Sequence, residues 1–143
     1  MTKSLTNINV LDFSHALSGP FCSMLLAELG AKIIKIEPPH GDHFRPANGG
    51  ATFAVVNRNK RSLCLDLKQP SASIIMERLI SKCDVLVENF TPGTMKRLGY
   101  HYKALKKMKP DIIYASISGF GSTGPYKDLK GYDAVAQLSL IHI

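Results

Sequence analysis

A histidine lies in a loop where a ligand could reach it. His15 follows the alternating apolar and polar run 8–13, and Ser14 and Ser18 flank it ahead of Gly19-Pro20. An imidazole titrates near neutral pH and can bond through either ring nitrogen, so it can serve as a general base or as a ligand contact. Because a lone histidine is more often a contact than a catalyst, we expect His15 to touch a ligand.

A glycine-rich loop near the end of the chain imitates a dinucleotide site. The run Gly119-Phe120-Gly121-Ser122-Thr123-Gly124 matches the pattern G-x-G-x-x-G and follows an expected strand. That pattern binds a pyrophosphate when it opens a helix, whose N-terminus supplies the amide donors. Here the run 125–128 follows without helical periodicity. We therefore predict a glycine turn that packs beside another ligand, and not a nicotinamide or flavin site.

Cations outnumber acids and gather in two places. The net charge is +7, from 18 Lys and Arg against 11 Asp and Glu in 143 residues. Six cations and no acid lie between Lys96 and Lys109, and three more lie in the run 57–62. Such clusters hold phosphates or face water. No aromatic side chain interrupts the run 57–62, so we expect no nucleic-acid partner.

Neither metal nor disulfide chemistry is expected. His40, Asp42 and His43 have the donor types of a metal site, but a loop rich in glycine and proline gives them no rigid spacing. The cysteines form an odd set without a C-x-x-C pair, and we expect small buried apolar side chains. They are Cys22, Cys64 and Cys83.

Strand and helix signals alternate along the chain. The expected strands are 8–13, 32–36, 62–67, 85–87 and 112–118, and the expected helices are 21–29, 71–82, 95–98 and 102–108. In the helix 71–82 we expect Ile75, Leu79 and Ile80 to face inward. This alternation favours an α/β, Rossmann-like parallel sheet with helices on both faces. Ligands of such sheets bind beyond the carboxyl ends of the strands, so we expect the site in the following loops. They are 14–20, 37–50, 89–93 and 119–125.

Composition indicates one globular domain with a core. The chain is 45% hydrophobic and 20% charged, with a mean hydropathy of zero. About two thirds of the unfolded surface can be buried at this length. No apolar run approaches the roughly 18 residues that a membrane span needs, and the first residues lack the apolar stretch of a signal peptide. We expect a cytoplasmic protein with no membrane association.

Five motifs, in order, resemble the family III CoA-transferases, which include formyl-CoA transferase, the carnitine CoA-transferases and, as relatives, the α-methylacyl-CoA racemases. The resemblance runs from about residue 8 to residue 137. The motifs are LDFSHALSGP at 11–20, LGAKIIKIEPPHGD at 29–42, NRNKRS at 57–62, DVLVENF at 84–90 and GFGSTGP at 119–125.

The resemblance implies a CoA site and no metal. It places His15, Ala16, Leu17 and Ser18 against the CoA chain, Leu65 and Lys68 at the adenine, Asn89 and Phe90 along the pantetheine, and Arg97 and Lys130 at the phosphates. CoA is a polyanion, so this ligand suits the basic clusters. Leu17 stands where formyl-CoA transferase has a glutamine, and Pro38 where it has an arginine. These two departures argue against a formyl-CoA-specific pocket.

The resemblance also implies the reaction, which is exchange of CoA between an acyl-CoA and a carboxylic acid through a covalent aspartyl intermediate. The nucleophilic aspartate is expected downstream of Ile143, so no catalytic residue is assigned in this chain. Asp128 and Asp133 are not expected to replace it. Complete family members form interlocked homodimers.

The resemblance further predicts that this chain is the N-terminal fragment of a larger domain and is inactive alone. Residues 1–137 form the expected Rossmann-like CoA-binding part. The run 138–143, LSLIHI, equals the translation of a transposon end used in sequencing libraries, so we expect a non-native tail.

Two alternatives remain open. One is a racemase fragment, which Tyr132 opposes because it stands where racemases carry a histidine that transfers a proton, and tyrosine has an unperturbed pKa of about 10. The other is a non-catalytic CoA-binding or anion-binding module that is complete at this length.

Overall fold

Five parallel strands form one sheet in the computed structural model, which describes residues 3–132, 135 and 137. The strands are β1 (Asn9–Asp12), β2 (Lys32–Glu37), β3 (Lys60–Cys64), β4 (Val85–Glu88) and β5 (Ile113–Ser116). Their order is β3-β2-β1-β4-β5, and each neighbouring pair is parallel. The chain first builds outward from β1 to β3 and then continues on the other side of β1. In open α/β sheets the ligand crevice lies outside the carboxyl ends of the strands where the order reverses, and these strands are here β1 and β4.

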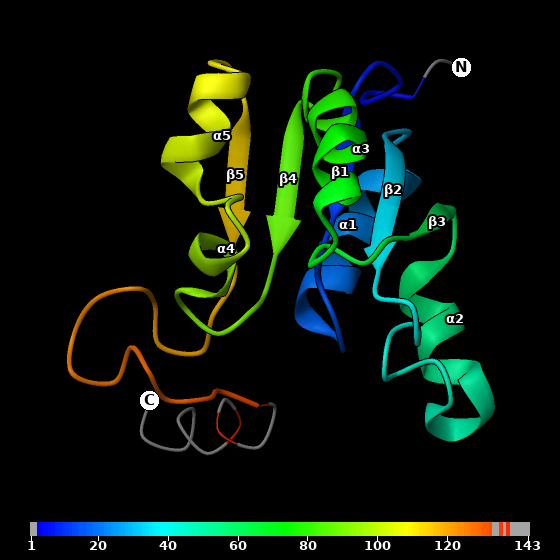
Figure 1. Cartoon of the computed structure of the whole chain (residues 1–143). Coiled ribbons are helices and arrows are strands. Elements are labelled where there is room, and N and C mark those ends of the chain that lie inside the picture. Colours follow the sequence, from blue (N-terminus) through cyan, green and yellow to red (C-terminus); the bar gives the residue numbers. More distant parts are fainter. Residues whose placement is uncertain (1–2, 133–134, 136, 138–143) are drawn as a thin grey trace.

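Helices cover both faces of the sheet, as predicted. The helices are α1 (Ser18–Glu28), α2 (Ala51–Asn57), α3 (Pro70–Ile80), α4 (Thr94–Arg97) and α5 (Tyr102–Met108), and a 3-10 turn, η1, spans Ala47–Gly50. Figure 1 shows α3, α4 and α5 in front of the sheet and α1 behind it. The short α2 contacts α1. The Rossmann-like α/β architecture is thus confirmed.

Alternate residues of β1 supply two hydrophobic cores. Leu11 and Phe13 point into the larger core beneath α3, α4 and α5, whereas Val10 points into the smaller core beneath α1. The larger core also buries Met76, Ile80, Leu86, Leu105 and Ile112, and the smaller one Ala27, Ala31, Ile33 and Val87. Among the described residues, no helix has the length and apolar character to span a membrane.

Two local expectations are wrong in part. In α3, Ile80 is buried and Leu79 packs against the larger core, as predicted, but Ile75, expected inward, is 42% exposed. The buried residues of this helix are Ala72, Met76 and Ile80. These buried residues follow one another at intervals of four, so the small Ala72 is buried although larger apolar side chains, a leucine and isoleucines, are available in the same helix. Among the cysteines only Cys83 is buried, since Cys22 is partly exposed and Cys64 is exposed.

Two predictions concern residues that the structure does not describe. Asp133 and the expected tail 138–143 lie outside the described residues. The division of the chain at residue 137 therefore stays a prediction.

Candidate functional site

Three of the four expected loops meet at the carboxyl ends of β1, β2 and β4. The backbone N–H of His15, after β1, donates to Oδ1 of Asn89, after β4, at 2.8 Å, and Nδ2 of Asn89 donates back to the His15 carbonyl at 2.7 Å. Asp42, after β2, brings its Oδ2 to 3.3 Å from Nδ1 of His15. We call His15, Asp42 and Asn89 the carboxyl-end site.

The turn before α1 has a backbone that few sequences can adopt. Ala16 has a φ of +62°, a left-handed conformation that is uncommon for residues with a side chain. A Cβ on Gly19 would lie 2.2 Å from Cβ of Ser14, so only glycine fits there. Asn89 stabilises this turn, because it bonds both backbone groups of His15 and also reaches Ser18 Oγ at 3.3 Å.

Six of the ten implied CoA contacts gather around this turn. They are His15, Ala16, Leu17, Ser18, Asn89 and Phe90. The His15 and Phe90 rings lie 5.3 Å apart, and Leu17 is 48% exposed. The turn thus presents one polar ring and an apolar side chain at the crevice.

The other four implied contacts lie elsewhere. Leu65 packs against the larger core, and the exposed Lys68 follows it ahead of α3. Arg97 is exposed in α4, where its Nη2 donates to Thr94 Oγ1 at 2.8 Å. Lys130 is also exposed.

The glycine loop after β5 is explained by close backbone contact. A Cβ on Gly119 would lie 2.5 Å from Cα of Gly131, so two backbone segments touch there. No helix begins in the run 119–130, which confirms that this loop does not have the geometry of a dinucleotide fingerprint.

A buried network of charges supports the site and was not expected from the sequence. Asp12, Lys35, Glu37 and Asp42 are each no more than 2% exposed, and the Lys60 side chain is 2% exposed. The ion pairs are Asp12 with Lys60 at 2.9 Å, Asp42 with Lys35 at 3.0 Å, and Glu37 with Arg45 at 2.6 Å. Three anions thus face three cations, which is the arrangement that buried charges require.

Hydrogen bonds keep two carboxylates ionised, Glu37 at the end of β2 and Asp42 in the loop after it. Burial would raise the pKa of Glu37, but hydrogen bonds from Arg45, Ser62 and the Asp42 N–H lower it to about 2. Burial likewise opposes ionisation of Asp42, yet the neighbouring His15, the N–H of Phe44 and Lys35 hold its pKa well below the usual range. For Lys60, burial lowers the pKa, and the Asp12 carboxylate partly compensates.

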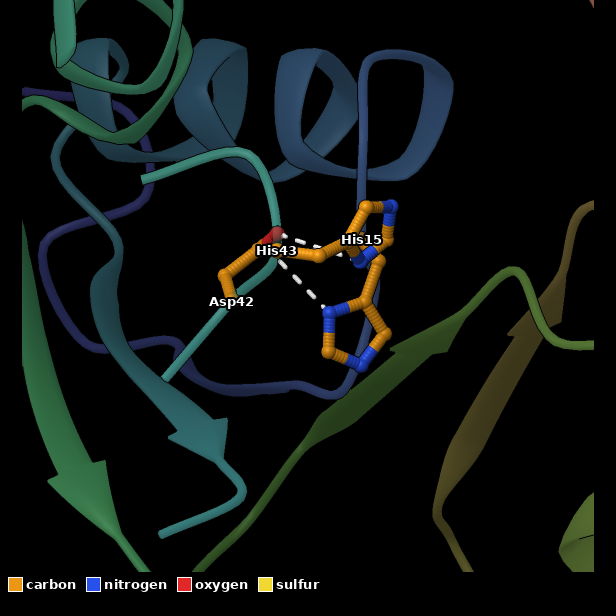
Figure 2. Close-up of side chains that lie close together, drawn as sticks. All are labelled: His15, Asp42 and His43. Carbon is orange, nitrogen blue, oxygen red and sulfur yellow. Dashed lines mark ion pairs between the residues drawn. The ribbon is translucent and has the colours of Figure 1, made fainter. Parts of the chain in front are cut away.

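Metal-ligand donor types do cluster here, in a set that differs from the one weighed in the sequence. His15, Asp42 and His43 each offer an atom within 4.8 Å of the others, and Figure 2 shows one nitrogen of each ring turned toward the carboxylate. However, Nζ of Lys35 lies 3.0 Å from Oδ2 of Asp42. A divalent cation on that carboxylate would therefore face a buried ammonium, so the arrangement suits hydrogen bonding to histidine better than metal binding.

A cleft of about 670 Å³ adjoins the carboxyl-end site between β5, α4 and α5. Glu88, Thr91, Lys96, His101, Tyr102 and Tyr114 are among its lining residues. Glu88 connects it to the site, because its Oε2 accepts the N–H of Phe90 at 2.8 Å while its Oε1 accepts the Tyr114 hydroxyl at 3.1 Å. Burial, together with the Glu88 charge, raises the pKa of Tyr114, so this phenol stays protonated.

Comparison with known proteins gives a consistent family. The sequence profile of CoA-transferase family III matches residues 5–140. A formyl-CoA:oxalate CoA-transferase of Bradyrhizobium diazoefficiens is 47% identical over 96% of this chain. A CAIB/BAIF family protein from Brucella suis superposes with a TM-score of 0.93 at 35% identity over 97% of this chain, and a hypothetical protein from Mycobacterium tuberculosis with 0.92 at 36% identity over 97%.

The chain is shorter than these relatives. It spans 34% of the length of the Bradyrhizobium protein, and 39% of each of the two solved structures.

Proposed function

Because this chain belongs to CoA-transferase family III, we propose that the protein to which it contributes moves CoA between carboxylic acids and that the carboxyl-end site holds part of the CoA. The observation that carries the binding part is the convergence of His15 and Asn89, on the loops after β1 and β4, through two hydrogen bonds of 2.8 and 2.7 Å. Crevices at such a switch in strand order are where open α/β sheets bind ligands.

The proposed reaction is covalent exchange on an aspartate. The carboxylate of that residue attacks the thioester carbonyl. The C–S bond breaks, CoA leaves as a thiolate, and the acyl group remains on the aspartate as a mixed anhydride. The thiolate then attacks the aspartyl carbonyl, which releases the donor acid and leaves CoA on the aspartate. An acceptor carboxylate repeats these steps in reverse, so no proton is gained or lost. We place the nucleophile downstream of residue 143, and the proposed assembly is a homodimer.

In the proposed CoA site, Arg97 and Lys130 contact the phosphates, and Leu65 and Lys68 border the adenine. The turn before α1, which contains His15, borders the pantetheine together with Asn89 and Phe90. Exposed guanidinium and ammonium groups suit phosphates. The exposed Leu17 at the turn supports an acyl pocket with an apolar wall. Formyl-CoA and oxalate, named for the Bradyrhizobium relative, are the first donor and acceptor to test.

Calorimetry with CoA tests the binding part. Arg97→Ala should weaken the affinity of the 143-residue chain by about tenfold or more, because a hydrogen bond to a charged group contributes roughly 1.5–3 kcal/mol. Arg78→Ala is the matched control. Arg78 is exposed in the last turn of α3, and because α3 runs back toward the amino ends of the strands, Arg78 lies at the edge of the sheet opposite the site. Equal affinity of wild type and Arg97→Ala would remove Arg97 from the site, and absence of binding to wild type would contradict a CoA site in this chain.

Reading the gene beyond the Gln137 codon tests the catalytic part. We expect an open frame that continues and encodes an aspartate shortly downstream. A stop codon in the natural gene would favour the non-catalytic binding module instead.

A further inference from the structure

We infer that Asp42 is a positioning residue, which fixes the proton of His15 on Nδ1 so that Nε2 accepts a hydrogen bond from the ligand. The identity of that ligand rests on the proposed function, but the position of the proton does not. Nothing in the sequence linked these two residues, which lie on different loops after β1 and β2.

Asp42 is held as an anion from several directions. Its side chain is 1% exposed, Oδ2 lies 3.0 Å from Nζ of Lys35, and Oδ1 accepts the backbone N–H of Phe44 at 2.9 Å. The backbone N–H of Asp42 itself donates to Glu37 at 3.0 Å, which fixes the residue between its neighbours. An ionised carboxylate has no proton to donate, so any hydrogen bond with His15 must use a proton on the ring.

The two ring nitrogens of His15 have different surroundings. Nδ1 of His15 and Oδ2 of Asp42 are both buried, neither has a hydrogen-bond partner among the described residues, and the two atoms lie 3.3 Å apart, while the His15 side chain as a whole is 19% exposed. A proton on Nδ1 would give both of these buried atoms a partner, and the neutral ring would then carry its lone pair on Nε2. Nε2 lies on the other side of the ring, away from Asp42, and is the nitrogen left for a ligand (Figure 2).

The ring of His15 has further contacts that restrict its rotation. Its centroid lies 5.3 Å from the Phe90 ring and 5.6 Å from the His43 ring, and Asn89 bonds both backbone groups of His15. His43 also faces the carboxylate, but at 3.7 Å and with 64% of its side chain exposed. Asp42 therefore acts mainly on His15.

This proton position selects the kind of ligand group that His15 can meet. An Nε2 lone pair accepts a hydrogen bond and cannot donate one to a phosphate or a carboxylate. In CoA the uncharged donors of the pantetheine arm are its two amide N–H groups and its hydroxyl group. We therefore assign His15 to a pantetheine donor and not to a phosphate.

Nuclear magnetic resonance of the 143-residue chain labelled with 15N-histidine tests the proton position directly. Long-range 1H–15N correlation of wild type should show His15 protonated on Nδ1. In Asp42→Asn the side-chain amide can donate to Nδ1, so the proton should move to Nε2, while His43→Ala should leave it on Nδ1. A wild-type ring protonated on Nε2, or an unchanged ring in a folded Asp42→Asn variant, would overturn the inference; the wild-type measurement needs no variant to fold.

Titration with pantetheine, which lacks the phosphates, tests the ligand assignment. Asp42→Asn should weaken pantetheine binding about threefold to tenfold, the range of one hydrogen bond, while Asp111→Asn, at an exposed carboxylate after α5, changes it less than twofold. Equal affinity of wild type and Asp42→Asn would refute the pantetheine contact. If wild type binds neither CoA nor pantetheine, the ligand assignment fails together with the proposed function, whereas the proton position is still decided by the resonance experiment.

Discussion

Replacing Glu37 by glutamine should make this fold less sensitive to acid. Glu37 is the anchor of the loop that carries Asp42, because Arg45 donates to both of its oxygens at 2.6 Å, Ser62 donates at 2.6 Å and the Asp42 N–H donates at 3.0 Å. All of these donors favour the ionised form. Protonation of Glu37 therefore opposes folding.

The size of the effect follows from the pKa of Glu37, which the hydrogen bonds lower from 4.5 to about 2 against the effect of burial. One pKa unit corresponds to about 1.4 kcal/mol, so ionised Glu37 contributes about 3 kcal/mol at pH 7. A lowered pKa gives stability that is present above the unfolded value of 4.5 and is lost as the pH falls toward 2. About 2 kcal/mol should be gone by about pH 3.

Urea unfolding at pH 7 and pH 3 measures this contribution. Wild type should lose about 2 kcal/mol more than Glu37→Gln on going from pH 7 to pH 3, because the variant has no carboxylate to protonate at this position. Both proteins keep the acid-sensitive Asp42, so it cancels in the difference. The exposed Glu77 of α3 provides the control Glu77→Gln, which should behave as wild type. An equal loss in wild type and Glu37→Gln would refute the reasoning.

Three further substitutions test the site and the core. Asn89→Ala should lower the free energy of unfolding, measured by chemical denaturation, by about 2 kcal/mol, since its two hydrogen bonds to His15 contribute about 1 kcal/mol each. An unchanged free energy of unfolding would mean that water replaces both hydrogen bonds. Met76→Ala, at a side chain with 0% exposure, should cost about 2–5 kcal/mol. Ile75→Ala, at 42% exposure, should cost less than about 1 kcal/mol; thermal unfolding that ranked the two the other way would contradict the observed helix face.

The sheet could be predicted from the sequence because each strand carries its own signal. The β-branched run 32–36 and the apolar triplet 85–87 both lie in observed strands, and alternation with helices indicates parallel pairing. The carboxyl-end rule then located the site, since loops after β1, β2 and β4 meet as expected. No helix was predicted for α2, because seven residues are too few to show a helical period. In α3, Ile80 and Leu79 face the core as predicted, whereas Ile75 does not, because Ala72 and Met76 complete the buried stripe.

Which side chains meet inside the site could not be predicted in the same way. His40, Asp42 and His43 were the candidates because they are close in sequence, whereas the structure brings in His15 from another loop. Which loop residues meet depends on tertiary geometry, and no residue spacing encodes it. One signal was available: Lys35 and Glu37 are charged residues inside a strand expected to be buried on both faces, and such charges need partners.

The buried charges explain how separate loops come to hold one histidine. Replacing a buried ion pair by apolar side chains often leaves stability unchanged or improves it, whereas removing one partner is costly. The two charges of the pair Lys35–Asp42, each on a side chain that is 1% exposed, are therefore poorly explained by stability alone. What they do provide is a fixed position for the loop after β2, because each charge has to meet its own partner and no apolar contact is so specific. Asp42 reaches His15 only if that loop is fixed, so the cost of burying these charges is consistent with a role in presenting Nε2 of His15 at the crevice.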